Sequence, residues 1–229
     1  MKTQTIINCV FAVAFVGYVV WQRNPTFDTI TCKIWNIVDA EGKERITAFT
    51  NPDGQASVAW LDKDEKKRIT AGTLADGEAS VQCLDKDGKG RIVAATLADG
   101  QASVQLFDKD RKLRISAATL ANGQAGLKWL DKDGKLRIAA ATLADGAGVQ
   151  WFDKDGKARI DAVTRDDGEA SVQWYDKDEE IRIAAATFAD GEAGVQWFDK
   201  DKKVKIAATT FPDGTVILPT KDDNPPKKP

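Results

Sequence analysis

The sequence predicts an all-β fold built from tandem antiparallel β-hairpins. A basic residue recurs at intervals of 23 residues, short runs alternate between apolar and polar side chains, and Asp-Gly or Asp-Lys-Asp sequences separate these runs. Alternation with period two between such turns is typical of hairpins, and no apolar stripe at helical spacing continues across the turns. About eight units are expected to form a curved meander, a closed barrel or propeller-like form, or a solenoid, preceded by one N-terminal hydrophobic helix.

The segment 1–24 is predicted to be a signal anchor. An apolar run extends from Ile6 to Trp21 and is interrupted by Asn8 and Gly17. Its length of about 16 residues lies between a signal-peptide core and a full membrane span of roughly 20. A cleaved signal and a buried core helix therefore stay open as alternatives. An uncleaved anchor would hold the repeats outside the cytoplasm, in the periplasm or at the cell surface, whereas cleavage would make the protein secreted.

Residues 25–219 form the predicted repeat domain. The basic residue that anchors each unit recurs after 23 residues at every step except one, which is 22. The anchors are Arg45, Arg68, Arg91, Arg114, Arg137, Arg159, Arg182 and Lys205. A shortened unit comes before the first complete one and a truncated unit after the last, as is usual for the ends of a repeat array. The charged, Pro-rich tail 220–229 is expected to be disordered.

The alternation also predicts how the strands pair. The expected pairs in the first hairpin are Ile46 with Trp60, Ala48 with Val58 and Thr50 with Ala56. The next turn continues the same three rows, so one face carries an Ile/Trp row, an Ala/Val row and a Thr/Ala row. The residue missing from the 22-residue unit falls in the Asp145-Gly146 turn, so Ile138 should still oppose Trp151. Because the rows differ in bulk, the sheet is expected to curve toward its small residues, and our hypothesis is that it either closes or winds into a solenoid.

Two rows on this face have more than one interpretation. The tryptophan row consists of Trp60, Trp129, Trp151, Trp174 and Trp197. Aromatic rows can stack sugars, but Cys83 and Leu106 take this position in two units, which favours a packed core. In a core, Trp151→Ala would cost about 3–5 kcal/mol. One threonine per unit forms a ladder that could bind ice or a flat crystalline surface, but its place beside alanine favours an ordinary strand residue.

The opposite face carries glutamines near the strand centres and large apolar residues at the strand ends. Continuing the register places Phe107 opposite Arg114 and Tyr175 opposite Arg182, where the arginine stems could cover the rings. We interpret this face as a half-covered outer surface or, alternatively, as an interface for another chain or a ligand. The candidate interaction residues are Phe107, Phe152, Tyr175 and Phe198.

The paired aspartates of the Asp-Lys-Asp turns are the candidate metal ligands, because calcium binds oxygen-rich loops. The candidates are Asp85, Asp87, Asp131, Asp133, Asp153 and Asp155. No third carboxylate follows at ligand spacing, and a lysine usually stands there instead. A turn-forming role is therefore favoured, and neither a metal nor another cofactor is predicted.

Composition argues against catalysis and nucleic-acid binding. Histidine is absent, which removes the commonest general base and metal ligand. The three cysteines, Cys9, Cys32 and Cys83, form no CxxC pair. With 33 basic and 35 acidic residues the net charge is −2, whereas nucleic-acid binders are usually strongly basic. No catalytic residue is predicted.

The segment Val38–Ile46, VDAEGKERI, and its later counterparts have the pattern D-x-x-G-K-x-R followed by an Asp-Gly turn. The chain in this respect resembles uncharacterised bacterial exported or membrane-anchored proteins with hairpin repeats of about 23 residues, and related segments of phage tail-fibre-like proteins. That resemblance implies hairpins but no activity. The sequence therefore leads us to expect a non-enzymatic extracytoplasmic interaction or scaffold module. The alternative is a self-associating cell-envelope or fibre component. Its partner would be a protein or cell-envelope component, including a second copy, with the membrane contacted through the anchor.

Overall fold

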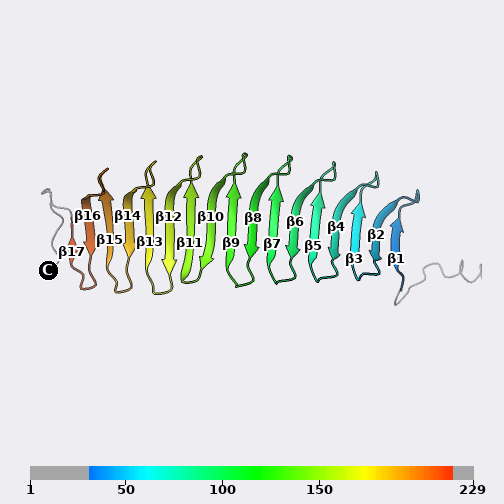
Figure 1. The fold of residues 1–229 in the computed structure, drawn as a ribbon, viewed down its shortest axis with the longest axis horizontal. Coiled ribbons are helices and arrows are strands. Elements are labelled where there is room, and N and C mark those ends of the chain that lie inside the picture. The colour runs from blue at the N-terminus through cyan, green and yellow to red at the C-terminus, as the bar shows by residue number, and fades with distance from the viewer. Residues whose placement is uncertain (1–30, 219–229) are drawn as a thin grey trace, which may run out of the picture. The chain divides into compact units, whose positions relative to one another are not determined.

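The computed structural model describes residues 31–218, which form a single antiparallel sheet of seventeen strands (Figure 1). The strands are β1 (Ile34–Val38), β2 (Glu44–Thr50), β3 (Ala56–Leu61), β4 (Lys67–Thr73), β5 (Ala79–Leu84), β6 (Gly90–Thr96), β7 (Ala102–Phe107), β8 (Leu113–Thr119), β9 (Ala125–Leu130), β10 (Leu136–Leu143), β11 (Gly146–Phe152), β12 (Ala158–Arg165), β13 (Ala170–Tyr175), β14 (Ile181–Thr187), β15 (Ala193–Phe198), β16 (Val204–Thr210) and β17 (Val216–Ile217). No helix in this range is long and apolar enough to cross a membrane. The signal anchor and the tail 220–229 lie outside the described residues and stay predictions.

Each strand pairs with its neighbours in the chain, so the predicted hairpin meander is confirmed. The predicted pairs of the first two turns are all present: Ile46 with Trp60, Ala48 with Val58, Thr50 with Ala56, Trp60 with Ile69, Val58 with Ala71 and Ala56 with Thr73. The short unit keeps the register too, since Ile138 pairs with Trp151. Its hairpin is tightened at the tip, where Leu143 pairs directly with Gly146.

All the turns except the shortened one between β10 and β11 share one backbone geometry that depends on a residue with positive φ. In the turn after β5, the amide of Gly88 donates to the Asp85 carbonyl (3.0 Å), and the amide of Asp85 donates to the Lys89 carbonyl (2.9 Å). Gly88 has a φ of 75°, a conformation that glycine adopts without steric cost. Four turns keep this left-handed conformation with a side chain present, at φ values of 57° to 63°. These residues are Glu65, Arg111, Glu179 and Lys202.

A β-bulge follows each Asp-Lys-Asp turn and corrects part of the predicted register. Phe107 pairs with Leu113 and not with Arg114, because the register shifts between Leu106 and Phe107. Tyr175 likewise pairs with Ile181 and not with Arg182. The arginine is the extra residue of the bulge, so it has no direct partner in the ladder. The alternation of apolar residues does not reveal this shift, because the bulge lies outside the three rows.

The sheet is one open layer, so the expected closure into a barrel or propeller-like form is wrong. β1 pairs with β2 and β17 with β16, and neither meets another described strand. Closing a sheet requires neighbouring strands to be staggered by a fixed shear. The rows from Ile46 in β2 to Ile206 in β16 accumulate no stagger, because every pairing keeps isoleucine opposite its row partner. The difference in side-chain bulk between the rows therefore does not lead to a closed sheet.

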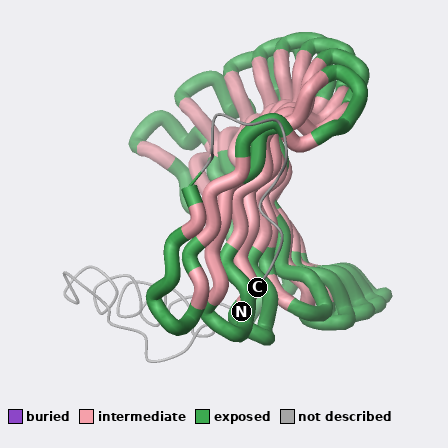
Figure 2. The backbone as a smooth tube through the Cα atoms, turned by 90° about the vertical axis from the view of Figure 1, so that its left-hand side faces the viewer, coloured by how far each residue is buried: buried purple, intermediate pink, exposed green. Residues whose placement is uncertain are grey.

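A single layer leaves the sheet without a hydrophobic core. Among residues 31–218, Ala59 is the only buried apolar residue, at 5% exposure. Viewed along the sheet in Figure 2, the strand directions turn progressively, the strands are half-buried and the turns are exposed. Stability therefore comes from backbone hydrogen bonds and from contacts between side chains on neighbouring strands.

Candidate interaction surface

One face of the sheet carries almost nothing but apolar side chains. We call it the tryptophan face and define it as the Ile/Trp, Ala/Val and Thr/Ala rows of β2–β16. Every residue in these rows is Ile, Val, Leu, Trp, Cys, Ala or Thr, and no charged residue occurs in them. A strand face that normally meets water would carry charged and polar residues. This composition is typical of a sheet face that packs against another layer.

The described residues do not cover this face. Trp60, Trp151 and Trp197 are 37–38% exposed, and Val81 and Val104 are 44–47% exposed. The tryptophan row was expected to form a packed core, but with no second layer its rings lie half-exposed on the surface. The ladder threonines are exposed as well. Large contiguous apolar patches of this kind mark interaction sites on soluble proteins.

The opposite face, which we call the glutamine face, holds the four aromatic residues proposed from the sequence. Phe107, Phe152, Tyr175 and Phe198 are half-buried there, each directly before the first aspartate of a turn. The Tyr175 hydroxyl donates to the Gln173 side chain at 2.6 Å. Burial raises the pKa of Tyr175, with a further contribution from the negative charge of Asp161. These four rings are thus less exposed than Trp60, Trp151 and Trp197 of the other face.

The first aspartate of each Asp-Lys-Asp turn organises the turn. Asp131 is representative: its Oδ1 accepts hydrogen bonds from the amides of Asp133 (2.9 Å) and Lys135 (3.0 Å). Its Oδ2 forms an ion pair with Arg137, the residue of the following bulge. Side-chain acceptors of this kind stabilise turns by replacing backbone partners. The carboxylate of a candidate metal ligand is therefore already engaged by three donors within its own hairpin.

The bulge arginines also connect neighbouring hairpins. Arg114 donates to the carbonyl of Lys132 in the next turn at 3.1 Å while pairing with Asp108. Arg159 and Arg182 donate to the carbonyls of Asp176 and Asp199 in the same way. The bulge places these guanidinium groups at the sheet edge, where their charge-assisted hydrogen bonds join several pairs of successive turns.

The pKa values of these aspartates reflect the donors around them. The amide of Glu180 lowers the pKa of Asp176, partial burial opposes this, and the Asp178 amide and Arg182 bring it to about 2. Partial burial alone would raise the pKa of Asp153, but the Lys157 and Asp155 amides and Arg159 lower it to about 2. These carboxylates stay charged at any physiological pH. They are structural anions and not proton-transfer groups.

The second aspartate of each turn has a different environment. Asp133 pairs with the preceding Lys132 at 2.8 Å, and both side chains are more than half exposed. Asp87 and Asp155 occupy the same position beside Lys86 and Lys154. Within residues 31–218 no three Asp, Glu, Cys or His side chains are grouped so that they could hold a metal ion. The paired aspartates therefore divide into one turn-forming and one solvent-facing residue.

The two long edges of the sheet differ in charge. The basic edge consists of the eight Asp-initiated turns with their bulge residues (39–45, 62–68, 85–91, 108–114, 131–137, 153–159, 176–182 and 199–205), along the top of Figure 1; it carries 25 Lys or Arg and 20 Asp or Glu. The acidic edge consists of the eight turns at the opposite strand ends (51–55, 74–78, 97–101, 120–124, 143–146, 165–169, 188–192 and 211–215). It carries eleven acidic residues and one basic residue, Arg165. The acidic residues are Asp53, Asp76, Glu78, Asp99, Asp145, Asp166, Asp167, Glu169, Asp190, Glu192 and Asp213. The Ile/Trp row borders the basic edge, and the Thr/Ala row borders the acidic edge.

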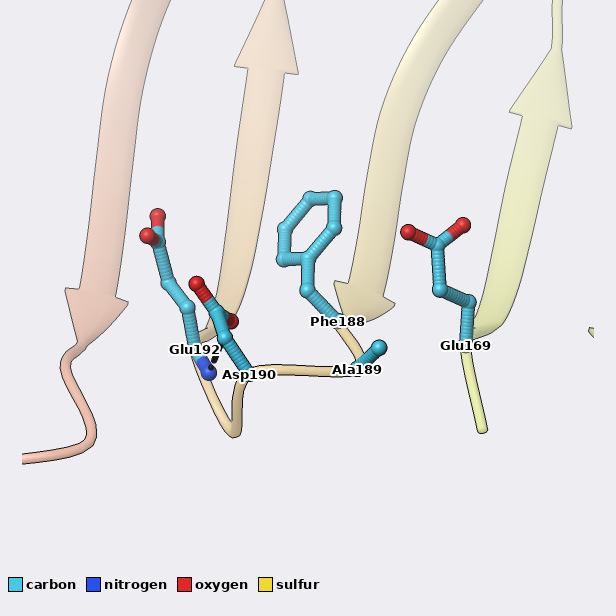
Figure 3. A pocket seen from close by; sticks show the side chains of 5 residues that line it. All are labelled: Glu169, Phe188, Ala189, Asp190 and Glu192. Atoms are coloured by element: carbon cyan, nitrogen blue, oxygen red, sulfur yellow. Dashed lines mark hydrogen bonds between the residues drawn. The ribbon is translucent and has the colours of Figure 1, made fainter. Parts of the chain in front are cut away.

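A shallow hollow lies between two turns of the acidic edge (Figure 3). Glu169, Phe188, Ala189, Asp190 and Glu192 line it, and Asp190 accepts a hydrogen bond from the Glu192 amide at 2.9 Å. Its lining includes three carboxylates, one phenyl ring and no basic side chain. The hollow is open to solvent and repeats the ordinary turn geometry, so it does not resemble an active site.

Sequence reasoning missed two features of this surface. Period-two alternation identifies which residues share a face, but it does not say whether another layer covers that face. A signal was nevertheless present, since the sequence offers no second set of apolar elements of matching length to form a covering layer. The arginine connections were also missed, although an arginine or lysine stands six residues after the first aspartate in every unit.

Comparisons with known proteins add little to this description. No protein-family model and no curated protein matches the sequence. Among solved structures, the sheet is similar to the SAS-4 (dCPAP) TCP domain of Drosophila melanogaster, solved in complex with a proline-rich motif of Ana2 (dSTIL). The similarity has a TM-score of 0.40 and 12% identity, over 86% of this chain and 99% of that one. A second match, TcdB2-TccC3-Cdc42, has a TM-score of 0.20 and 9% identity, over 81% of this chain and 17% of that one.

Proposed function

We propose that this chain is a non-enzymatic interaction or scaffold module whose binding surface is the tryptophan face. The observation that supports this is the charge-free composition of rows that lie half-exposed on β2–β16. Burying apolar surface is the main favourable term in most protein association. Covering a face of this composition with a partner therefore makes a favourable contribution to the free energy of binding.

The turns favour a structural and not a catalytic role for the carboxylates. The first aspartate of each turn is held by amides and an arginine, and the second is paired with a neighbouring lysine. The same arrangement recurs in successive units, whereas an active site requires a few residues in a special environment. The repeats thus form a structural frame that presents the tryptophan face.

We further propose that segment 1–24 tethers this frame to a membrane, with the repeats outside the cytoplasm. The support is the apolar run from Ile6 to Trp21, flanked by polar residues. Alkaline extraction of the membrane fraction tests the tether, because an anchored protein stays with the lipid and a peripheral one is released. Release of the full-length protein would contradict an uncleaved anchor.

A matched pair of variants tests the binding surface. Val104 and Gln105 are adjacent in β7 and lie on opposite faces. Tagged full-length protein carrying Val104→Lys or Gln105→Lys is recovered from native membranes, and the proteins that accompany it are identified by mass spectrometry. Gln105→Lys is a conservative control, because Lys128 occupies the equivalent position in β9. A partner lost with Val104→Lys and kept with Gln105→Lys is the expected result. Equal recovery with both variants would contradict binding through the tryptophan face.

A further inference from the structure

We propose that the partner on the tryptophan face is a second copy of this chain, packed face to face about a two-fold axis along the length of the sheet. This inference rests on the proposed function, because it names the occupant of the same surface. Rotation about that axis lays each strand over its equivalent and reverses the order of the three rows. Three properties of the face select this occupant and this orientation.

The first property is area. Strands are spaced about 4.8 Å apart and rise about 3.4 Å per residue, so the five-residue width of the face over β2–β16 covers roughly 1,200 Å². Two such faces together would bury at most about 2,400 Å², so contact over about two thirds of their length already reaches the roughly 1,600 Å² of a standard stable interface. A second copy therefore supplies a surface of matching length and composition.

The second property is shape. The Ile/Trp row borders the basic edge and the Thr/Ala row borders the acidic edge, so the face is thicker on one side than on the other. In the proposed dimer the bulky row of one copy lies over the small row of its partner, and the Ala/Val rows meet in the centre. The layer between the sheets then has a nearly uniform thickness, as face-to-face packing at about 10 Å requires. Rotation about an axis parallel to the strands would instead stack bulky on bulky and small on small.

The third property is charge. The basic edge carries 25 basic and 20 acidic residues, whereas the acidic edge carries eleven acidic residues and one basic residue. The rotation that places bulky over small also places the basic edge of one copy over the acidic edge of the other. The alternative rotation would bring the two acidic edges together, which like-charge repulsion opposes. Shape and charge therefore favour the same orientation independently.

Cross-linking across β9 tests the orientation, because this is the middle strand, where twist displaces the partner least. Two differently tagged full-length chains carry Ala125→Cys and Trp129→Cys, in a background with Cys9→Ser, Cys32→Ser and Cys83→Leu. Replacing Trp129 by cysteine is compatible with the fold, since Cys83 occupies the same row in β5. The proposed dimer places the mixed pair about 10 Å apart across the layer and two Trp129→Cys sites about 17 Å apart. Treating membranes that contain both chains with a short bis-maleimide should therefore give the mixed product in preference to either homotypic one.

The outcomes separate this inference from the proposed function. A predominant Trp129→Cys homotypic product would overturn the orientation, and no cross-linked product would overturn the second copy as occupant. Val104→Lys should reduce the mixed product about tenfold or more, because it buries an unpaired charge, while Gln105→Lys should leave it unchanged. If cross-linking fails but a foreign protein is still lost only with Val104→Lys, the proposed function stands and this inference does not. Failure of both experiments would refute both.

Discussion

The left-handed turn residue provides a quantitative test of how the hairpins are stabilised. Arg111 has a φ of 62°, and its side chain makes no hydrogen bond or ion pair with another described residue. For a residue with a side chain, this conformation costs about 1–2 kcal/mol. Glycine removes that cost but adds about 0.4–1 kcal/mol through its greater freedom in the unfolded chain. Arg111→Gly should therefore stabilise the β7–β8 hairpin by about 1 kcal/mol.

Hydrogen exchange of the full-length protein measures this effect locally. A gain of about 1 kcal/mol slows exchange of the amides that close the hairpin roughly fivefold, if they exchange by local opening. Gly88→Arg is the reciprocal control, because Gly88 occupies the same turn position at a φ of 75° and a Cβ there would meet no atom within 4 Å. This change should accelerate exchange in the β5–β6 hairpin by a similar factor. Unchanged exchange in both variants would show that the left-handed residue does not control hairpin opening.

Three further changes follow from the structure. In the sheet without a partner, Trp151→Ala should cost about 2 kcal/mol in chemical denaturation and not the 3–5 expected of a core, because a ring 37% exposed buries only about 90 Å² more than alanine at about 25 cal/mol per Å²; a loss above 4 kcal/mol would indicate that another layer covers the face, as in the proposed dimer. Asp131→Ala should lower the Tm more than Asp133→Ala, since only the former accepts two amides and an arginine; equal Tm values would contradict this division. The pKa of Asp176 lies near 2 in the folded chain and near 3.9 when unfolded, so its contribution to stability is present above about pH 4 and lost as pH falls toward 2. Circular dichroism melts across this range should show that decline, and a smaller one in Asp176→Asn.

Most of the architecture could be predicted from the sequence because the repeat determines it locally. The pairs from Ile46 with Trp60 onward follow from alternation and turn length, and the deletion at the β10–β11 turn left the register intact. The bulge at Arg114 could not be found in this way, since it shifts only the strand end beyond the apolar rows. Closure was predicted from side-chain bulk, but closing a sheet depends on stagger between strands, which the bulk of residues such as Trp151 does not set.

The candidate site could be predicted less well, for a physical reason. Alternation shows which residues share a face but not whether that face is buried. The Trp151 row was therefore assigned to a core and the Phe107 row to the surface. In a single layer neither face is enclosed, so large side chains on both faces stay partly exposed. Exposure of the tryptophans could be determined only once the sheet was known to have no second layer.

The absence of accumulated stagger has a consequence for the size of the molecule. Every hairpin contacts only the hairpins on either side, and each adds two strands, or about 9.6 Å, to the length of the sheet. Inserting or deleting a 23-residue unit would therefore lengthen or shorten the sheet by one fixed step without disturbing any other contact. The number of repeats encoded in the gene therefore determines the length of the sheet, in steps of one hairpin.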